Sequence, residues 1–248
     1  MIKTIILLIV IAILGTFIYL KLQVSGDPNS TFNQSTRYTL GKHPWLRTIF
    51  SLRSFGDARA EFFSGSGPII IEWFKPQTED MDFSGVLDKF SQAVAGYTGR
   101  EVKVTRSGSV DDSTLAIANL AVYKLNASVK ESGGGSALLV FFTFDYSPRD
   151  NNELSATYEE TGMVIALTAH KKFAQDYSQD LNTYLLSSLS HEFGHQIGLS
   201  HNTDPKCIMS LHAGIDGKPL ESYGRTTPQD FCQVEKEQIA NLKLQFGN

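Results

Sequence analysis

Hydrophobic and polar positions divide the chain into an apolar N-terminal run, a polar stretch and a mixed remainder. The run from Thr4 to Leu20 contains no charged residue, and Lys3 and Lys21 flank it. A helix of that length measures about 25 Å, at the short end of what spans a bilayer. Because the run has no polar face, we expect residues 1–21 to be a transmembrane anchor or a cleaved secretory signal rather than a core helix.

The polar stretch covers residues 22–44 and predicts a tether that holds a folded domain, residues 45–248, away from the membrane. Aromatic and aliphatic residues then occur among arginines from Trp45 to Phe55. We interpret these residues as the first packed segment of the domain rather than as a helix lying on the membrane surface.

Within the domain, the period of the apolar positions predicts strands and helices. Apolar residues recur at helical spacing from Phe83 to Tyr97, and Gly99 supplies a stop. Residues 115–125 fit a helix or a strand. The predicted strands are 69–74, a segment around 102–104, 137–146, 155–160 and 163–170, and a second helix is predicted from 181 to about 199. Strands that first alternate with helices and then follow one another predict an α+β domain with a mixed sheet.

Composition excludes some classes of function. The net charge of −4 gives no basic surface for nucleic acid, so we expect no nucleic-acid partner. The chain also lacks the Gly-x-Ser-x-Gly turn that presents the nucleophile of many serine hydrolases.

The strongest chemical signal is HEFGHQIGLSH, residues 191–201. His191 and His195 stand four apart, so a helix directs both imidazoles to one side, where they can bind one metal ion. A catalytic zinc commonly takes three protein ligands, and His201 can be the third because Gly198 can end the helix in a left-handed conformation. Zinc activates a water molecule, and Glu192 beside the first ligand can accept its proton. The pattern therefore predicts one catalytic Zn²⁺ and hydrolysis of peptide bonds.

The same residues resemble a known clan. HEFGHQIGLSH matches the HExxHxxGxxH signature of the metzincin zinc peptidases, and Met209 looks like the methionine of the turn beneath their metal. The resemblance implies zinc ligands His191, His195 and His201, a general base at Glu192 and a structural Met209. It also implies a twisted, mixed five-stranded sheet packed on helices that include the active-site helix. An antiparallel edge strand, assigned to residues 155–160, would pair with an extended peptide or protein substrate.

A closer resemblance is to the archaemetzincins, in which four cysteines around the methionine hold a second, structural zinc. Cys207 and Cys232 match two of those positions, but Asn202 and Glu235 stand where the other two cysteines would be. Two cysteines cannot form a four-thiolate site, so we do not expect the structural zinc. Cys207 and Cys232 are then either a disulfide, favoured if the domain lies in an oxidising compartment, or two free thiols.

The sequence thus predicts a zinc metallopeptidase, acting as an endopeptidase or an aminopeptidase. It would be membrane-anchored with its catalytic domain outside the cytoplasm, or secreted after signal cleavage. Tyr223 is a candidate stabiliser of the transition state, while His43 and His170 lack ligand spacing and are expected at the surface. The alternative is a zinc-containing module that binds peptides without cutting them, and the intact Glu192 argues against it.

Overall fold

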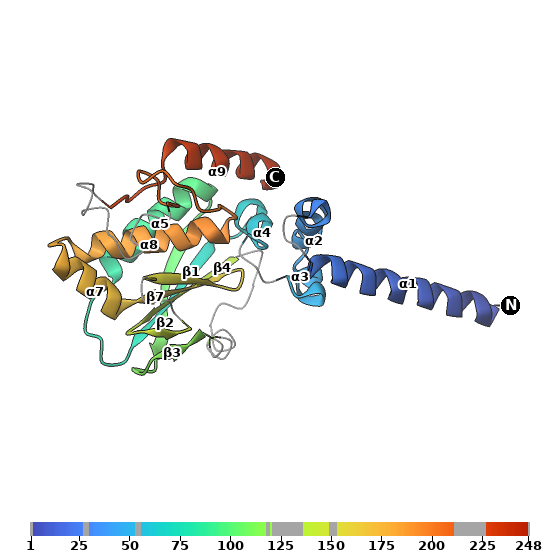
Figure 1. Cartoon of the computed structure of the whole chain (residues 1–248), viewed down its shortest axis with the longest axis horizontal. Helices are drawn as coiled ribbons and strands as arrows, with labels where there is room; N and C mark the ends of the chain where they lie inside the picture. The colour runs from blue at the N-terminus through green and yellow to red at the C-terminus, as the bar shows by residue number, and fades with distance from the viewer. Residues whose placement is uncertain are drawn as a thin grey trace.

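A helical N-terminal segment projects from a layered body in the computed structural model of the chain (Figure 1). The structure describes residues 2–26, 30–52, 56–117, 120, 136–148, 153–210 and 227–247. In the body, three of the helices lie on one side of a sheet: α5 (Ser84–Thr98), α8 (Leu181–Gln196) and α9 (Gln233–Phe246).

The main sheet has five strands, of which four run parallel and one, at an edge, runs antiparallel. Their order is β2 (Val102–Val110), β1 (Ile69–Pro76), β4 (Ser136–Thr143), β7 (Gly162–Ala166) and β6 (Ser155–Tyr158). A separate short pair is formed by β3 (Leu115–Ala116) and β5 (Tyr146–Ser147). The predicted α+β fold, with a mixed five-stranded sheet and an antiparallel edge strand, is confirmed.

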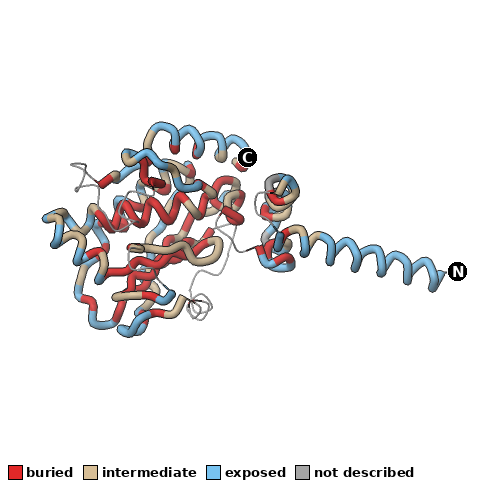
Figure 2. Tube along the Cα trace, viewed as in Figure 1, coloured by how far each residue is buried: buried red, intermediate tan, exposed pale blue. Residues whose placement is uncertain are grey.

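The inner strands β4 and β7 are buried on both faces of the sheet. Successive side chains of a strand point to opposite sides. In β4, Leu138, Val140 and Phe142 belong to the core that α5 and α8 cover, whereas Leu139 and Phe141 belong to a second core on the other face. Buried residues accordingly follow the strands and α8 in Figure 2. Because α8 is packed against the sheet, the positions of its polar residues, among them His191, Glu192 and His195, are set by the core.

The helix predicted from Phe83 to Tyr97 is confirmed as α5. Val86, Leu87 and Phe90 bury one side of it, at the spacing that predicted it. Gly99 ends the helix with φ of 75° and donates its N–H to the Ala95 carbonyl at 2.8 Å. A residue with a side chain would be strained in that left-handed conformation.

The strand predicted over residues 163–170 is wrong in its second half. β7 ends at Ala166 and a helix, α7 (Leu167–Asp176), follows directly. Leu167 is fully buried, so the apolar run continues across the junction and the sequence pattern shows no boundary between the strand and the helix. His170 lies on α7 and is fully buried, not at the surface: its ring nitrogens lie 2.8 Å from the Ala166 carbonyl oxygen and from the Ser188 hydroxyl oxygen.

Other boundaries also differ from the pattern. The core begins before the first predicted strand, since Phe62 and Phe63 of α4 (Arg59–Ser64) are buried in it. The second predicted helix, α8, ends at Gln196. Helix α9 was not predicted. Of the ambiguous segment 115–125, the structure describes residues 115–117, which include β3, and residue 120.

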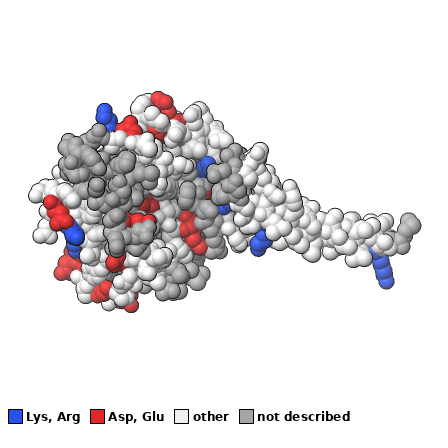
Figure 3. All heavy atoms as spheres, viewed as in Figure 1, with Lys and Arg blue, Asp and Glu red and all other residues white. Residues whose placement is uncertain are grey.

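Helix α1 (Ile2–Val24) is long and apolar enough to cross a membrane, and its most apolar window has no buried residue. Basic side chains occur on it only at Lys3 and Lys21, which leaves the surface between them uncharged (Figure 3). A cleavable secretory signal has the same properties.

The segment after α1 is largely helical where it is described, with η1 (Asn33–Arg37), α2 (Tyr38–Gly41) and α3 (Pro44–Phe50). Arg37 forms a salt bridge with Asp57 at 2.7 Å. Phe50 lies against Phe17 of α1, with ring centroids 5.3 Å apart. The segment from Trp45 therefore packs on α1 rather than on the sheet, while the division into anchor, tether and domain stays a prediction.

Candidate metal centre

Three imidazoles converge at the end of α8. His191 and His195 lie one turn apart on the helix, and His201 lies on the loop that follows it. The Nε2 atom of His201 is 3.2 Å from that of His191 and 3.0 Å from that of His195. Nitrogen ligands on one tetrahedral zinc at about 2.0–2.1 Å are roughly 3.3 Å apart, so this spacing fits a single zinc ion.

The other ring nitrogens show why the cluster fits a cation. The Nδ1 atom of His191 lies 2.8 Å from the Ile208 carbonyl oxygen, and that of His195 lies 3.1 Å from the Leu199 carbonyl oxygen. Each Nδ1 therefore carries the proton and donates it, which leaves both Nε2 atoms as lone-pair acceptors. His201 can donate to only one of them, whereas a metal ion accepts lone pairs from all three. Carbonyl partners of this kind also fix ligand orientation.

Burial keeps the histidines neutral. Loss of solvation lowers the pKa of His191 to about 4, although the hydrogen bond to the Ile208 carbonyl acts in the opposite direction. It also lowers the pKa of His195 to about 4. Burial also lowers the pKa of His201, which is the most exposed of the three. Neutral imidazole is the form that binds a metal.

Glu192 points from α8 toward the edge strand β6. Its side chain is buried, and its two carboxylate oxygens accept hydrogen bonds from the Ser155 hydroxyl at 2.7 Å and the Thr157 hydroxyl at 2.5 Å. Ser155 and Thr157 are two apart on β6, so their side chains share the face directed at α8. Burial raises the pKa of Glu192, while His195 and the hydroxyls of Thr157 and Ser155 act in the opposite direction.

Gly198 turns the chain so that His201 returns to the cluster. Its φ of 88° is left-handed, as its predicted role requires. A Cβ there would lie 2.8 Å from the Cδ atom of Arg59, so the Arg59 side chain packs directly on the turn. The same guanidinium donates to the Gly56 carbonyl at 2.7 Å and lies 5.2 Å from the ring centroid of Phe246 in α9.

Met209 is fully buried beneath α8, which carries His191 and His195 and which we call the ligand helix. It lies in a turn of residues 207–210 that we call the Met-turn. A Cβ on Gly194 would collide with the Met209 sulfur and lie 3.2 Å from the Phe231 ring. Because Gly194 has no side chain, the Met-turn can pack closely against α8 at this position. The sequence pattern did not single it out.

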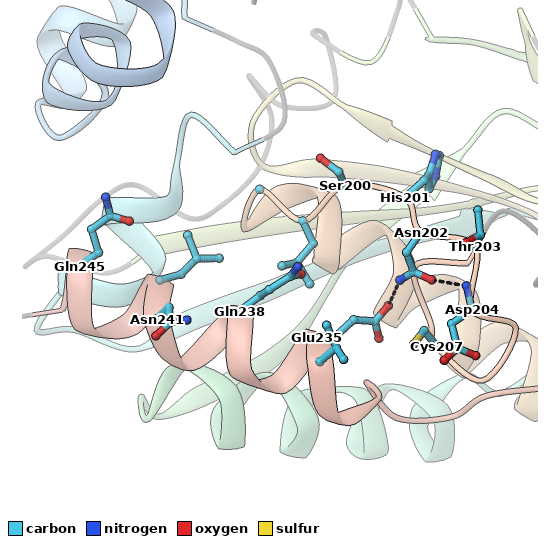
Figure 4. A pocket seen from close by; sticks show the side chains of 14 residues that line it. Ser200, His201, Asn202, Thr203, Asp204, Cys207, Glu235, Gln238, Asn241 and Gln245 are labelled. Carbon is cyan, nitrogen blue, oxygen red and sulfur yellow. Dashed lines mark hydrogen bonds between the residues drawn. The ribbon is translucent and has the colours of Figure 1, made fainter. Parts of the chain in front are cut away.

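The four positions compared with the structural-zinc cysteines also come together. Cys207 and Cys232 form a disulfide, with their Cα atoms 4.8 Å apart. Asn202 donates its side-chain N–H to Glu235 at 2.8 Å (Figure 4). Cys207, Cys232 and Glu235 are close enough to share a metal ion, but the disulfide occupies both sulfur atoms.

A pocket of about 510 Å³ lies between the loop after α8 and one side of α9 (Figure 4). Amide side chains of Gln238, Asn241 and Gln245 line it, together with His201. Glu192 and β6 do not line it, so it lies behind the third histidine and not on the side of the general-base candidate.

Comparisons with known proteins agree with this geometry. The family model of the matrixins matches residues 145–220, which include the three histidines, Glu192 and Met209. The structure of archaemetzincin from Methanopyrus kandleri is similar with a TM-score of 0.51 and 19% identity, over 73% of this chain and 97% of that chain. A zinc-dependent peptidase from Methanocorpusculum labreanum is similar with a TM-score of 0.50 and 16% identity, over 68% of this chain and 99% of that chain. The fold is thus metzincin-like, and the predicted resemblance to metzincin zinc peptidases, the archaemetzincins among them, is confirmed.

Ser155, Thr157 and Glu235 were not assigned contacts with the centre from sequence. Ser155 and Thr157 had one available signal, because alternation along the predicted edge strand places both on one face. Glu235 also had one signal, because it stands at one of the four positions where the archaemetzincins have the cysteines of their structural zinc, although the helix that carries it was not predicted. Tyr223 lies outside the described residues.

Proposed function

We propose that this protein is a zinc-dependent metallopeptidase that hydrolyses peptide bonds with Glu192 as general base. The observation that carries the proposal is the convergence of three imidazoles next to a buried carboxylate, with the Nε2 atoms of His191 and His195 both within 3.2 Å of that of His201. The matrixin match and the two structural neighbours support the same class. One catalytic zinc ion, held by His191, His195 and His201, is part of the proposal.

Bound zinc would supply an activated water molecule and polarise the substrate carbonyl. Glu192 would accept the proton of that water and then donate it to the leaving amine. Ser155 and Thr157 would keep the carboxylate oriented during both transfers, because each of its oxygens has a hydroxyl partner. Met209 would support the ligand helix from below without taking part in proton transfer.

The substrate would bind along β6. This strand ends the order of the sheet and pairs with β7, so its other edge can accept an extended peptide as an added strand. Main-chain pairing at β6 would bring the scissile bond beside Glu192, since Ser155 and Thr157 already contact that carboxylate. Helix α1 would anchor the enzyme in a membrane with its catalytic domain outside the cytoplasm, where the Cys207–Cys232 disulfide is stable.

The full chain, purified in detergent, provides the test. We expect about one zinc ion per chain, cleavage of casein or of a peptide library, loss of cleavage with a chelator and recovery when zinc is restored. Cleavage of N-terminally acetylated peptides would indicate an endopeptidase, and cleavage of free peptides alone an aminopeptidase. A parent protein that binds no zinc would overturn the proposal, and zinc with peptide binding but no turnover would indicate the peptide-binding module instead.

A further inference from the structure

Glu235 is the second buried carboxylate near the metal centre. It lies in the first turn of α9 and is 1% exposed. Its Oε1 atom accepts the Met209 backbone N–H at 2.7 Å and the Asn202 side-chain N–H at 2.8 Å. Its Oε2 atom accepts the backbone N–H of Cys232 at 3.0 Å and of Ile208 at 3.1 Å. Four donors on one buried carboxylate satisfy its charge, which would otherwise be costly to bury.

Helix capping accounts for only one of these bonds. The bond to Cys232 belongs to the capping box that begins α9. The bonds to Ile208 and Met209 leave the helix and hold consecutive backbone amides of the Met-turn. A residue that served α9 alone would have no need of them.

Ile208 connects Glu235 with a candidate zinc ligand. Its N–H is bound by Glu235, and its carbonyl oxygen accepts the Nδ1 proton of His191 at 2.8 Å. Met209, the next residue, packs against Gly194, one turn from His191 on the same helix. The Cys207–Cys232 disulfide attaches the same turn to the same end of α9. The Met-turn is thus fixed on one side by α9 and contacts the ligand helix on the other.

We propose that Glu235 is a positioning residue for the metal centre: by holding the Ile208 and Met209 amides, it sets the Ile208 carbonyl that orients His191. The inference rests on the proposed function only in requiring that the three histidines bind zinc. In oxidised protein the disulfide keeps the turn near α9, and Glu235 sets its orientation.

The test is Glu235→Gln in the full chain. Glutamine has nearly the size of glutamate, but its side-chain NH₂ group is a donor and would face N–H groups that are themselves donors. The backbone amides of the Met-turn would therefore lose acceptors. We expect the zinc dissociation constant, measured by competition with a chromophoric chelator, to rise about tenfold, as when other partners of metal ligands are removed. In the zinc-free protein, the Ile208 and Met209 amides should exchange hydrogen for deuterium faster than in the parent.

Two control variants on the same helix separate positioning from general destabilisation. Glu237→Gln makes the same chemical change at an exposed site and should alter neither measurement. Ile239→Ala opens the buried side of α9 and should lower the melting temperature, yet leave zinc affinity within about twofold when measured well below that temperature.

Each outcome decides the inference. A parent that binds zinc, with Glu235→Gln binding it equally well, would overturn the inference and leave the proposed function intact. Equal loss of affinity in Ile239→Ala would also overturn it, because stability alone would then explain the effect. If Glu235→Gln does not fold, Asn202→Ala removes one of the four donors, and we expect a two- to threefold weaker zinc affinity; unchanged affinity there would refute the positioning role.

Discussion

Two buried carboxylates near the histidine cluster have different surroundings, one on α8 itself and one on α9. Glu192 faces β6 and is bound by two hydroxyl groups, whereas Glu235 faces the Met-turn and is bound by four N–H groups. A hydroxyl can rotate and either donate or accept, so it can serve a carboxylate and a carboxylic acid alike. An N–H can only donate, and four such donors hold the Glu235 carboxylate in one orientation.

This difference matches the two roles that we propose, proton exchange for Glu192 and positioning of the Met-turn for Glu235. The partners of Glu192 allow it to gain and lose a proton without leaving a buried group unpaired. Burial alone would not distinguish the two carboxylates, since both are almost inaccessible to solvent.

Glu192→Gln should have the largest effect. The amide cannot accept the proton of the attacking water, so we expect kcat to fall about 10³-fold, near 4 kcal/mol in activation free energy. Zinc affinity should stay within about twofold of the parent, in contrast to Glu235→Gln. Steady-state peptide hydrolysis and zinc competition measure the two quantities, and activity within tenfold of the parent would remove Glu192 from the role of base.

Replacing both cysteines by serine tests the second attachment of the Met-turn. The disulfide joins residues 25 apart, and closing a loop of that size stabilises a folded chain by about 3.5 kcal/mol. Urea denaturation of the zinc-free full chain should show a loss of that order. A loss below about 1 kcal/mol would mean that Glu235 and the surrounding packing hold the turn without the disulfide.

Gly194→Ala should force the Met-turn away from α8. The added methyl group collides with the Met209 sulfur, and overpacking of this kind costs about 2 kcal/mol. We expect lower stability together with weaker zinc binding. Gly96→Ala is the matched control, because a Cβ at that helical position meets no atom within 4 Å and should leave both quantities unchanged or slightly improve stability.

Thr157→Val should have the smallest effect. It removes one hydroxyl partner of Glu192 at nearly constant shape, so we expect kcat to fall about tenfold, or about 1.4 kcal/mol, with KM within twofold. Thr157→Ser keeps the hydroxyl and should restore most of the rate. If valine and serine variants behave alike, orientation of Glu192 by this residue is ruled out.

The convergence of the three candidate ligands could be predicted from sequence because its geometry is local. His191 and His195 are brought together by the period of a single helix, and Gly198 supplies the turn to His201 within a few residues. The strands of the sheet were predictable for a similar reason, since short apolar runs between polar segments mark buried strands.

The remainder depended on contacts between distant parts of the chain. Thr157 lies 35 residues from Glu192, and Glu235 lies 26 from Met209, so only the completed fold brings each pair together. The junction between β7 and α7 was hidden because Leu167 is as buried in the helix as its neighbours are in the strand. His170 was misplaced because its partner Ser188 belongs to another helix.

The Arg59 side chain, which packs on Gly198 and lies over Phe246, has a practical consequence for dividing the protein. Residues 145–220, the part matched by the matrixin family model, contain every zinc-ligand candidate but neither Arg59 nor Phe246. A fragment limited to that part would leave the Gly198 turn without the two elements that cover it. A fragment that keeps this covering must include Gly56 and Arg59 as well as Phe246 of α9, so early and late portions of the polypeptide meet at the turn that precedes the third histidine.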